Sequence, residues 1–172
     1  SAALGQHITP ETPRDQLLSW CSDTDIDVAP QWVCGKLVEE LFEYYVIPTL
    51  TGPTFVFNYP VDTSPLVRAH RDRPGVVEKW DLYVNGYEQA TGYSELVDPV
   101  IQRQRLTEQA QLGAGGDAEA MPLDEDFLRA LEIGMPPSGG VGLGIDRLLM
   151  SLTGLGIRET ILFPLVKPEA TQ

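Results

Sequence analysis

The sequence predicts an α+β fold in which helices flank an antiparallel sheet, and three observations carry this prediction. Residues 78–96 form the clearest β-hairpin pattern, because Asn85-Gly86 is the preferred two-residue type I′ turn. Residues 54–60, rich in β-branched and aromatic side chains, and residues 139–145, rich in glycine, are two further candidate strands. Segments with helical periodicity or helix caps surround these strands. At 172 residues, the chain has the size of one domain.

Two helices are expected before the first strand. Thr12 is the candidate N-cap of the first helix, with Pro13 at its first position. Pro30 opens the second and longer helix, which Pro48 ends. Apolar residues recur along this second helix at a helical period, namely Val33, Leu37, Val38, Leu41, Phe42 and Tyr45. This stripe indicates a buried face.

Three helices are expected after the hairpin. Asp98 caps the first, over residues 98–116, and Asp124 caps the second, which stops at Gly134. The strand over 139–145 then runs directly into a third helix, over 146–154.

The composition is strongly acidic, with 25 Asp and Glu against 12 Lys and Arg and a net charge of −13. A chain this acidic is not expected to bind along a nucleic acid through phosphate contacts, so any RNA contact is expected to be local. The acids serve solubility, or some of them hold cations at a site. No apolar run approaches the roughly 18 residues that span a bilayer.

The chain has two cysteines and two histidines, which argues against a zinc site. Cys21 and Cys34 are expected to be buried or partly buried thiols in a reducing compartment, with a disulfide as the alternative.

Glycine occupies every second position from 140 to 144 in the stretch GVGLGIDR. Because strand side chains alternate between faces, Gly140, Gly142 and Gly144 share one bare face. The apolar residues between and after them, Val141, Leu143 and Ile145, are expected to point into the core. A glycine face allows close approach by something flat, or by a tightly packed neighbouring helix.

Arg147 follows this strand in the first turn of a helix, where the macrodipole disfavours a cation by roughly 0.3–1 kcal/mol. Asp146 suits the same dipole and is expected to be structural. An arginine in this place is suited to stacking on an aromatic ring or to forking onto phosphate. A nucleotide fits both halves of the motif, with its base on the glycine face and Arg147 as its cap.

Two acids of the hairpin are expected to lie close together. A two-residue turn places Tyr83 opposite Glu88 and Asp81 opposite Ala90, so that Asp81 and Glu88 are diagonal neighbours at roughly 7 Å. Such a pair repels unless a cation lies between the two acids, and Mg²⁺ with ATP phosphates is the natural candidate. The alternative is a solvated face with two unrelated acids.

Glu95 lies seven residues after Glu88, so strict alternation places it on the opposite face. A bulge at Gly92 would reset the alternation. If Glu95 is buried beside Tyr93 without an internal partner, it needs a cation from a ligand, because an unpaired buried charge is very costly.

Three segments, in this order, resemble the C-terminal part of the catalytic domain of class II lysyl-tRNA synthetases: TFVFNYPVDTSPLVR, WDLYVNGYEQATGYSELVD and GVGLGIDRLLMSLTGLGIRETILFP. The resemblance covers about residues 13 to 168. The last segment is similar to the third class-defining motif, at 140–153, whose arginine packs on the adenine of ATP. Aspartyl and asparaginyl relatives share the glycine strand and the arginine but not GYSEL, which resembles the lysine-pocket signature.

The resemblance implies a role for each residue of the hairpin. Asp81 and Glu88 would hold Mg²⁺ against the ATP phosphates. Glu95 would grip the ε-ammonium of lysine, with Tyr93 lining that pocket and Thr91 near the carboxylate or amine of the amino acid. Three of these positions depart from the commoner family pattern, in which glutamate stands at 81, asparagine at 91 and phenylalanine at 93.

For ATP, the resemblance implies contacts from Glu88, Gln89, Gly142, Gly144 and Arg147, with Arg147 as the catalytic residue. The implied activity is ATP-dependent activation of lysine to lysyl-adenylate and transfer of the lysyl group to tRNA. The implied enzyme is a cytoplasmic homodimer that needs Mg²⁺, and this segment makes no membrane contact.

The family's anticodon-binding domain and its first and second motifs do not occur in these 172 residues. Residues 1–172 are therefore expected to be the C-terminal portion of a class II synthetase catalytic domain, inactive in isolation. Three alternatives stay open. A paralogue that lysylates an elongation factor usually has histidine where Ser94 stands and lacks the LFP ending. The others are a synthetase module fused to a lipid-lysylating domain, and an independent, non-catalytic binding module.

Overall fold

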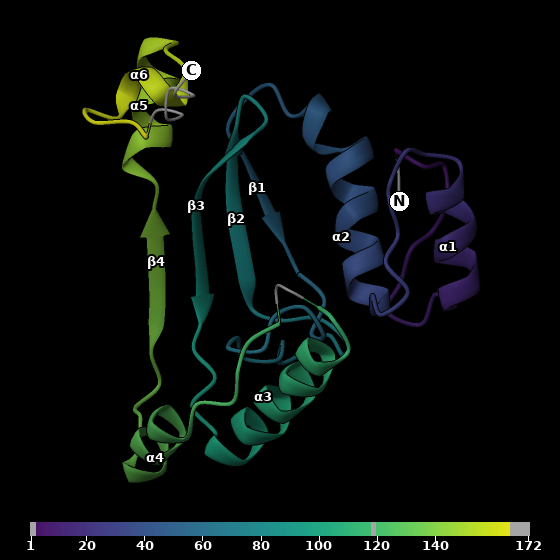
Figure 1. Cartoon of the computed structure of the whole chain (residues 1–172), viewed down its shortest axis with the longest axis vertical. Helices are drawn as coiled ribbons and strands as arrows, with labels where there is room; N and C mark the ends of the chain where they lie inside the picture. Colours follow the sequence, from purple (N-terminus) through teal and green to yellow (C-terminus); the bar gives the residue numbers. More distant parts are fainter. Residues whose placement is uncertain (1–2, 118–119, 166–172) are drawn as a thin grey trace, which may run out of the picture.

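The computed structural model describes residues 3–117 and 120–165. Four strands form one antiparallel sheet in the order β1-β2-β3-β4 (Figure 1). They are β1 (Thr54–Phe57), β2 (Lys79–Val84), β3 (Tyr87–Ser94) and β4 (Gly139–Leu143). This sheet with its surrounding helices confirms the predicted α+β class. The first strand is shorter than predicted, because Asn58 adopts a positive φ of 65° and turns the chain out of the sheet.

Two helices lie beside the β1 and β2 side of the sheet, α1 (Arg14–Ser22) and α2 (Cys34–Tyr45) (Figure 1). They enclose a core of Leu17, Cys21, Leu37 and Leu41, each at most 1% exposed. Cys21 and the half-buried Cys34 are both free thiols. The prediction of Thr12 as N-cap was wrong: Pro13 occupies that position, while the Thr12 hydroxyl accepts a hydrogen bond from the Thr9 amide.

The second helix begins four residues later than predicted, at Cys34 rather than Pro30. Its first turn receives a cap from a distant loop, because the Asp62 carboxylate accepts a hydrogen bond from the Gly35 amide at 2.9 Å. A cap supplied across 27 positions of sequence leaves no local signal. Pro48 lies in a short 3₁₀ turn, η1 (Ile47–Thr49), just after the helix.

The long helix α3 (Pro99–Ala114) begins as predicted, with the Asp98 carboxylate accepting hydrogen bonds from the first turn. It fastens the loop between β1 and β2. The Gln102 side chain donates to the carbonyl of Pro65 at 3.0 Å, and Arg105 donates to the carbonyls of Ser64 and Val67. This loop carries a small core of its own, formed by Tyr59, Val67 and Val77.

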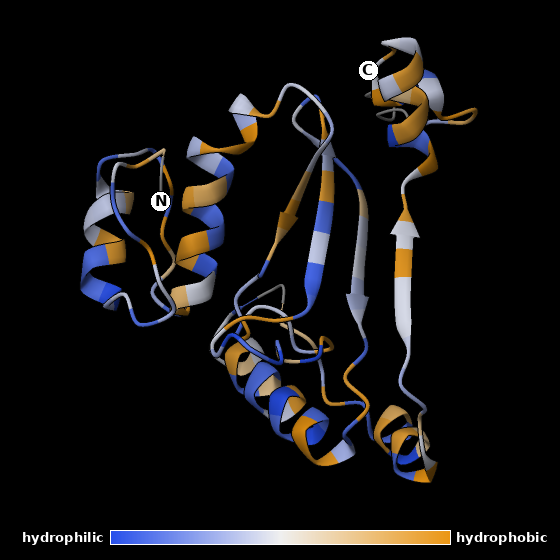
Figure 2. Cartoon of the chain, turned by 180° about the vertical axis from the view of Figure 1, so that it is seen from behind, coloured by the Kyte–Doolittle hydropathy of each residue, from blue (hydrophilic) through white to orange (hydrophobic). Residues whose placement is uncertain are grey.

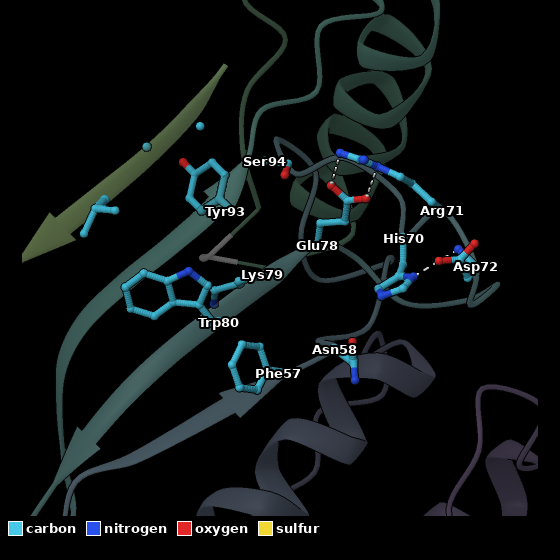
Figure 3. Close-up of a pocket in the computed structure, with 13 residues that line it drawn as sticks. Phe57, Asn58, His70, Arg71, Asp72, Glu78, Lys79, Trp80, Tyr93 and Ser94 are labelled. Carbon is cyan, nitrogen blue, oxygen red and sulfur yellow. Dashed lines mark hydrogen bonds and ion pairs between the residues drawn. The ribbon is translucent and has the colours of Figure 1, made fainter. Parts of the chain in front are cut away.

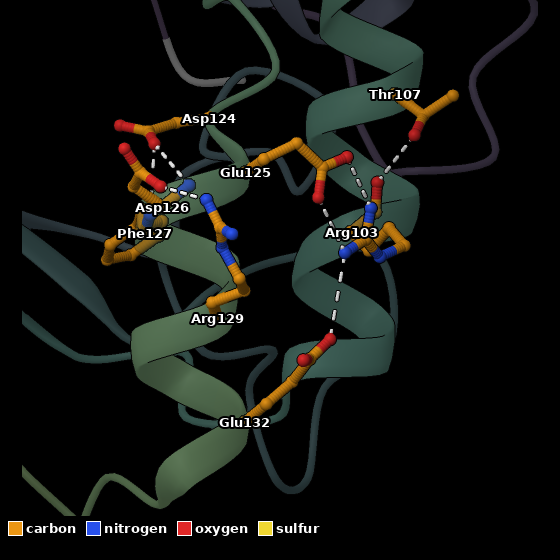
Figure 4. Close-up of polar contacts among 8 residues, drawn as sticks. All are labelled: Arg103, Thr107, Asp124, Glu125, Asp126, Phe127, Arg129 and Glu132. Atoms are coloured by element: carbon orange, nitrogen blue, oxygen red, sulfur yellow. Dashed lines mark hydrogen bonds and ion pairs between the residues drawn. The ribbon is translucent and has the colours of Figure 1, made fainter.

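The next helix, α4 (Glu125–Ile133), also begins as predicted, with Asp124 as its cap and Gly134, at a φ of 122°, at its end. Arg103 of α3 joins the two helices through ion pairs with Glu125 and Glu132 (Figure 4). This contact sets the position from which the chain enters β4.

The chain leaves β4 directly into α5 (Ile145–Thr153) and then α6 (Ile157–Thr160), which lie beyond one end of the sheet (Figure 1). The expectation that the apolar residues of the glycine strand point into the core was wrong. Val141, Leu143 and Ile145 are 71%, 51% and 60% exposed. The reason is that β4 is an edge strand. Within residues 3–117 and 120–165, nothing covers the direction in which these side chains point. No helix in these ranges is long and apolar enough to cross a membrane.

Candidate active site

The hairpin turn is the predicted one, with positive φ values of 52° at Asn85 and 78° at Gly86. Tyr83 lies opposite Glu88, also as predicted. Asp81, however, lies opposite Thr91 and not opposite Ala90. The register shifts between Leu82 and Tyr83, because β3 has one extra residue, Gln89, at this point.

This bulge decides which acids share a face. It lies between Glu88 and Glu95 and resets the alternation, so Thr91, Tyr93 and Glu95 lie on the same face as Asp81. We call this face of the sheet, which includes the glycines of β4 paired with Thr91 and Tyr93, the acidic face. The predicted bulge therefore exists, but at Gln89 and not at Gly92.

Gly92 has a different role, on the other face of the sheet. A Cβ atom there would overlap the indole ring of Trp80. Glycine at this position allows the Trp80 ring to lie flat across β3.

The glycines of β4 line the acidic face, because Gly142 pairs with Thr91 and Gly140 pairs with Tyr93. A Cβ atom at Gly140 would lie 3.0 Å from Oε1 of Glu95, and one at Gly142 would lie 3.6 Å from Cγ2 of Thr91. Most of the glycine strand is exposed. The bare surface thus runs open alongside Thr91 and Glu95.

Arg147 lies at one end of this bare surface, in the first turn of α5 after the N-cap Gly144. Its Nη1 donates a hydrogen bond to the Glu88 carbonyl at 2.8 Å and lies 3.9 Å from the Glu88 carboxylate. A cavity of about 380 Å³ opens there, lined by Glu88, Gln89, Ala90, Gly142, Leu143, Gly144, Asp146, Arg147 and Ile157. The predicted nucleotide-binding residues therefore meet around one cavity.

Asp81 lies deeper on the same face and is only 3% exposed. Its Oδ2 atom is 3.1 Å from Nζ of Lys79, and the same ammonium lies 4.0 Å from the centroid of the Tyr59 ring. Burial raises the pKa of the Tyr59 phenol, and the neighbouring Asp81 and Tyr83 raise it further.

Several oxygen atoms around Asp81 lack a partner. Within the described part of the chain, no group completes a hydrogen bond with Oδ1 of Asp81, Oγ1 of Thr91 or the hydroxyl of Tyr59. The Tyr59 hydroxyl lies close enough to the Asp81 and Tyr83 side chains for both to raise its pKa, but no hydrogen bond of good geometry joins it to either of them. Buried polar atoms without partners indicate a place for a ligand.

A metal ion would depend on groups from outside this chain. No cluster of three or more His, Cys, Asp or Glu side chains that could hold a metal occurs in residues 3–117 or 120–165. Mg²⁺, however, is commonly bound by one or two carboxylates together with water and substrate phosphates. The buried Asp81 carboxylate and the half-exposed Glu88 fit that pattern.

Glu95 differs from the other two acids. Asp81 and Glu88 each lie beside a basic side chain, whereas Glu95 forms no ion pair with any residue in the two described ranges. It is half-buried beside Tyr93, whose pKa is raised by burial and by the Glu95 charge. An unpaired, half-buried carboxylate in an open groove is suited to binding a cationic group.

A larger cavity, of about 600 Å³, lies mainly on the opposite face of the sheet (Figure 3). Strand alternation places Phe57, Trp80, Ser94 and Val141 on that face. Arg71 pairs with Glu78 there at 2.8 Å, and a hydrogen bond from Ser94 lowers the Glu78 pKa. Tyr93, Lys79 and Gly140 of the acidic face also line this cavity at its edge, whereas Asp81, Glu88, Glu95 and Arg147 do not. The larger volume of this cavity therefore does not make it the predicted site.

Residues 38–167 match the family model described as tRNA synthetases class II (D, K and N). The chain belongs to this family. The match covers most of the chain, from α2 through the glycine strand and α5 to beyond α6.

Relatives of this chain carry two kinds of name. A lysine--tRNA ligase of Kineococcus radiotolerans is 66% identical over 98% of this chain, and one of Mycobacterium tuberculosis is 57% identical over 99%. The chain spans about a third of the length of these relatives, 34% and 35%. A lysylphosphatidylglycerol biosynthesis bifunctional protein, LysX, of Nocardia farcinica is 53% identical over 98% of the chain, which spans 15% of that protein.

Sequence reasoning about this class II chain missed two residues of the site. Lys79 pairs with Asp81, and the Tyr59 ring lies against the Lys79 ammonium. A signal for Lys79 was present, because residues two apart in a strand share a face. Tyr59 comes from a loop, and no periodicity indicates where a loop residue will lie.

Proposed function

We propose that these residues are the C-terminal portion of the catalytic domain of a lysine--tRNA ligase, with the third class-defining motif at 140–153. The observation that most supports this proposal is the unpaired Glu95 carboxylate, which lies beside a bare glycine surface that ends at Arg147. The names of the most similar relatives agree with this proposal. ATP, lysine and tRNA are the proposed substrates, and the proposed enzyme is a cytoplasmic homodimer.

The lysine side chain is proposed to donate its ε-ammonium protons to Glu95. A charge-assisted hydrogen bond contributes about 1.5–3 kcal/mol, and an uncharged analogue would leave the acid unpaired. Tyr93 forms a wall of the same pocket, and Thr91 lies two residues further along β3 toward Arg147. The unpartnered Thr91 hydroxyl is available to the amine or carboxylate of the amino acid.

The adenine ring is proposed to lie on the bare backbone at Gly142 and Gly144, with the Arg147 guanidinium over it. Glu88 and Gln89 border the same cavity. Gly140 and Gly144 are four residues apart, which is roughly 13 Å along a strand. Ribose and phosphate would fill this interval, placing the α-phosphate near the lysine carboxylate.

Asp81 and Glu88 would hold Mg²⁺, which neutralises charge on the triphosphate when bound. The lysine carboxylate attacks the α-phosphate, the bond to the β-phosphate breaks, and pyrophosphate leaves. A hydroxyl of the terminal tRNA ribose then attacks the lysyl carbonyl and AMP leaves. The chain's own residues contribute positioning and charge: Glu95 orients lysine, and Arg147 fixes the nucleotide.

Calorimetric titration of the chain with lysine and with ATP tests the two halves of the site separately. In Glu95→Gln, lysine affinity is expected to fall at least tenfold, with ATP affinity unchanged, because only the amine loses its charged partner. In Arg147→Ala, the ATP affinity falls and the lysine affinity stays.

Glu78→Gln is the matched control, because Glu78 is an acid immediately before β2 that lines the cavity on the opposite face. Its two affinities are expected to equal those of the wild type. Unchanged lysine affinity in Glu95→Gln contradicts the assignment of the lysine pocket. If the wild type binds neither ligand, the same variants are measured in the longer protein by lysine-dependent ATP–pyrophosphate exchange. Wild-type exchange in its Glu95→Gln variant contradicts the function.

A second candidate is the same lysine-activating module within a bifunctional protein of the kind found in Nocardia farcinica, because that relative is 53% identical over 98% of the chain. The mass of the native protein distinguishes the two, since this chain spans 15% of that relative but about a third of the ligases.

A further inference from the structure

The Asp81 carboxylate is almost completely enclosed, at 3% exposed. Removing such a charge from water costs several kcal/mol unless a cation and hydrogen bonds compensate it. The cation present is Lys79, two residues earlier on the same strand, with its Nζ 3.1 Å from Oδ2 of Asp81. The chain therefore supplies its own positive charge to the acid that is proposed to hold Mg²⁺.

The Lys79 ammonium compensates only part of the site. It reaches one oxygen of Asp81, while Oδ1 of Asp81 and the oxygens of Thr91 and Tyr59 have no hydrogen-bond partner in the described ranges. An ammonium has three donors in a fixed tetrahedral arrangement, whereas a divalent ion accepts oxygen ligands on all sides. The surroundings of Asp81 thus offer oxygen ligands that Lys79 leaves unused.

The Lys79 side chain also has room to move away from Asp81. This side chain is 23% exposed, and its ammonium lies over the face of the Tyr59 ring, 4.0 Å from the ring centroid. The Glu39 carboxylate of α2 is a second acid near its charge. Burial raises the pKa of Glu39 to about 6, and the charge of Lys79 acts against that rise. Rotation of the lysine side chain away from Asp81 would bring its ammonium closer to solvent.

We propose that Lys79 is a built-in counter-ion that occupies the cation position at Asp81 and competes with the divalent metal for this carboxylate. The inference rests on the proposed function, in which Asp81 holds Mg²⁺. Lys79 stabilises the metal-free fold by neutralising a buried charge, and metal binding requires the ammonium to leave. Lys79 is thus a positioning residue that sets how weakly the site binds metal before ATP arrives.

The test is direct metal binding, read from the electron paramagnetic resonance signal of free Mn²⁺ in titrations of the chain with and without ATP. Lys79→Met is expected to bind Mn²⁺ about tenfold more tightly than the wild type, because the competing charge-assisted hydrogen bond is gone. Lys79→Arg keeps the charge and is expected to stay within about twofold of the wild type.

Two further variants keep the result interpretable. Lys79→Gln removes the charge but keeps a polar side chain, and it replaces Lys79→Met if circular dichroism shows that the methionine variant is unfolded. Lys36→Met is the matched control, because it removes a lysine from an ion pair with Glu40 on α2 at 3.0 Å. Its Mn²⁺ affinity is expected to equal that of the wild type.

Each outcome supports or overturns the proposal. Tighter binding in both charge-removing variants, lost again when Asp81→Asn is added, supports it. Equal Mn²⁺ affinity in wild type, Lys79→Met and Lys79→Gln overturns the counter-ion role and leaves the proposed function intact. Absence of Mn²⁺ binding in all of them, even with ATP, overturns both the counter-ion role and the assignment of Asp81 as a metal-holding residue.

Discussion

The helical layer α1–α2 and the segment β4–α5–α6 carry the same kind of sequence signal but have opposite environments. In the helical layer, Leu17, Cys21, Leu37 and Leu41 are at most 1% exposed. In α5 and α6 no residue is buried, although α5 is as clearly amphipathic as α2. Figure 2 shows hydrophobic residues along α5 and α6, which lie apart from the helical layer.

An apolar stripe in the sequence therefore predicts which face of a helix or strand is apolar, but it does not predict whether another element packs against that face. The two N-terminal helices provide each other's partner surface within 32 residues of sequence, from Arg14 to Tyr45. Helix α5 contacts α6 and β3, but within residues 3–117 and 120–165 these contacts bury none of its residues, so Leu149 and Leu152 stay 40% and 74% exposed. The bare glycine surface is open in the same region.

The largest expected effect tests the buried side of this comparison. Leu37→Ala removes a side chain that is 0% exposed in the helical core, and it is expected to lower the free energy of unfolding by about 2–5 kcal/mol. Leu152→Ala, the same change at an exposed position, is expected to alter it by less than about 0.5 kcal/mol. Urea unfolding measures both. Equal losses would mean that α5 is buried in solution.

A change at the boundary of the two regions comes next. Gly92→Ala in β3 places a methyl group within the Trp80 ring, and overpacking of this kind costs about 1–3 kcal/mol. Gly52→Ala is the control, because an added methyl group there meets nothing within 4 Å. Thermal unfolding compares the two. Wild-type stability in Gly92→Ala would show that the Trp80 ring does not lie across β3.

A pH effect is expected in the helical layer. Glu39 of α2 has a pKa raised from 4.5 to about 6, first by burial, with a hydrogen bond from Thr63 acting in the opposite direction. Between these two values the folded chain binds more protons than the unfolded chain. The free energy of unfolding therefore falls as pH rises through this window, by about 1–2 kcal/mol in total.

Glu39→Gln is expected to flatten this slope between pH 4.5 and 6, because the amide does not titrate. The exposed Glu11→Gln serves as control and should leave the slope as it is. Denaturant unfolding at several pH values gives the result. A slope unchanged in Glu39→Gln would assign the effect to another group.

The smallest effect concerns the contact that leads into β4. Arg103→Ala removes the exposed ion pairs between α3 and α4 that Figure 4 shows. A small loss of stability that disappears at high salt is expected, since exposed charges are screened. Arg129→Ala, which removes a pair within α4 alone, is the matched control. A loss that persists at high salt would indicate a packing role for Arg103.

Much of the fold followed from local chemistry. Asn85-Gly86 specifies its turn because two consecutive positive φ values exclude most other residues. Asp98 and Asp124 mark helix starts because their short carboxylates reach the backbone amides that the first turn leaves unpaired. These features depend on neighbours within three positions in the sequence.

The candidate site was predicted residue by residue, but its geometry was not. Asp81, Thr91, Glu95 and Arg147 were each named from the sequence, whereas the facing of Asp81 and Thr91 depends on the bulge at Gln89. A one-residue shift in register moves every later side chain to the other face, and no local propensity specifies where the shift occurs. The pairing of Lys79 with Asp81 depends on their enclosure by Tyr59 from a distant loop.

The sequence by itself determined the four strands and the five longer helices, where the hairpin turns, and most of the residue types that the candidate site contains. These are local choices, set by backbone sterics and hydrogen bonds between near neighbours. Only the tertiary structure decided that three acids share one face, that Asp62 caps α2, and that the apolar face of β4 and α5 stays open. Those outcomes depend on contacts between residues far apart in the chain, which periodicity does not encode.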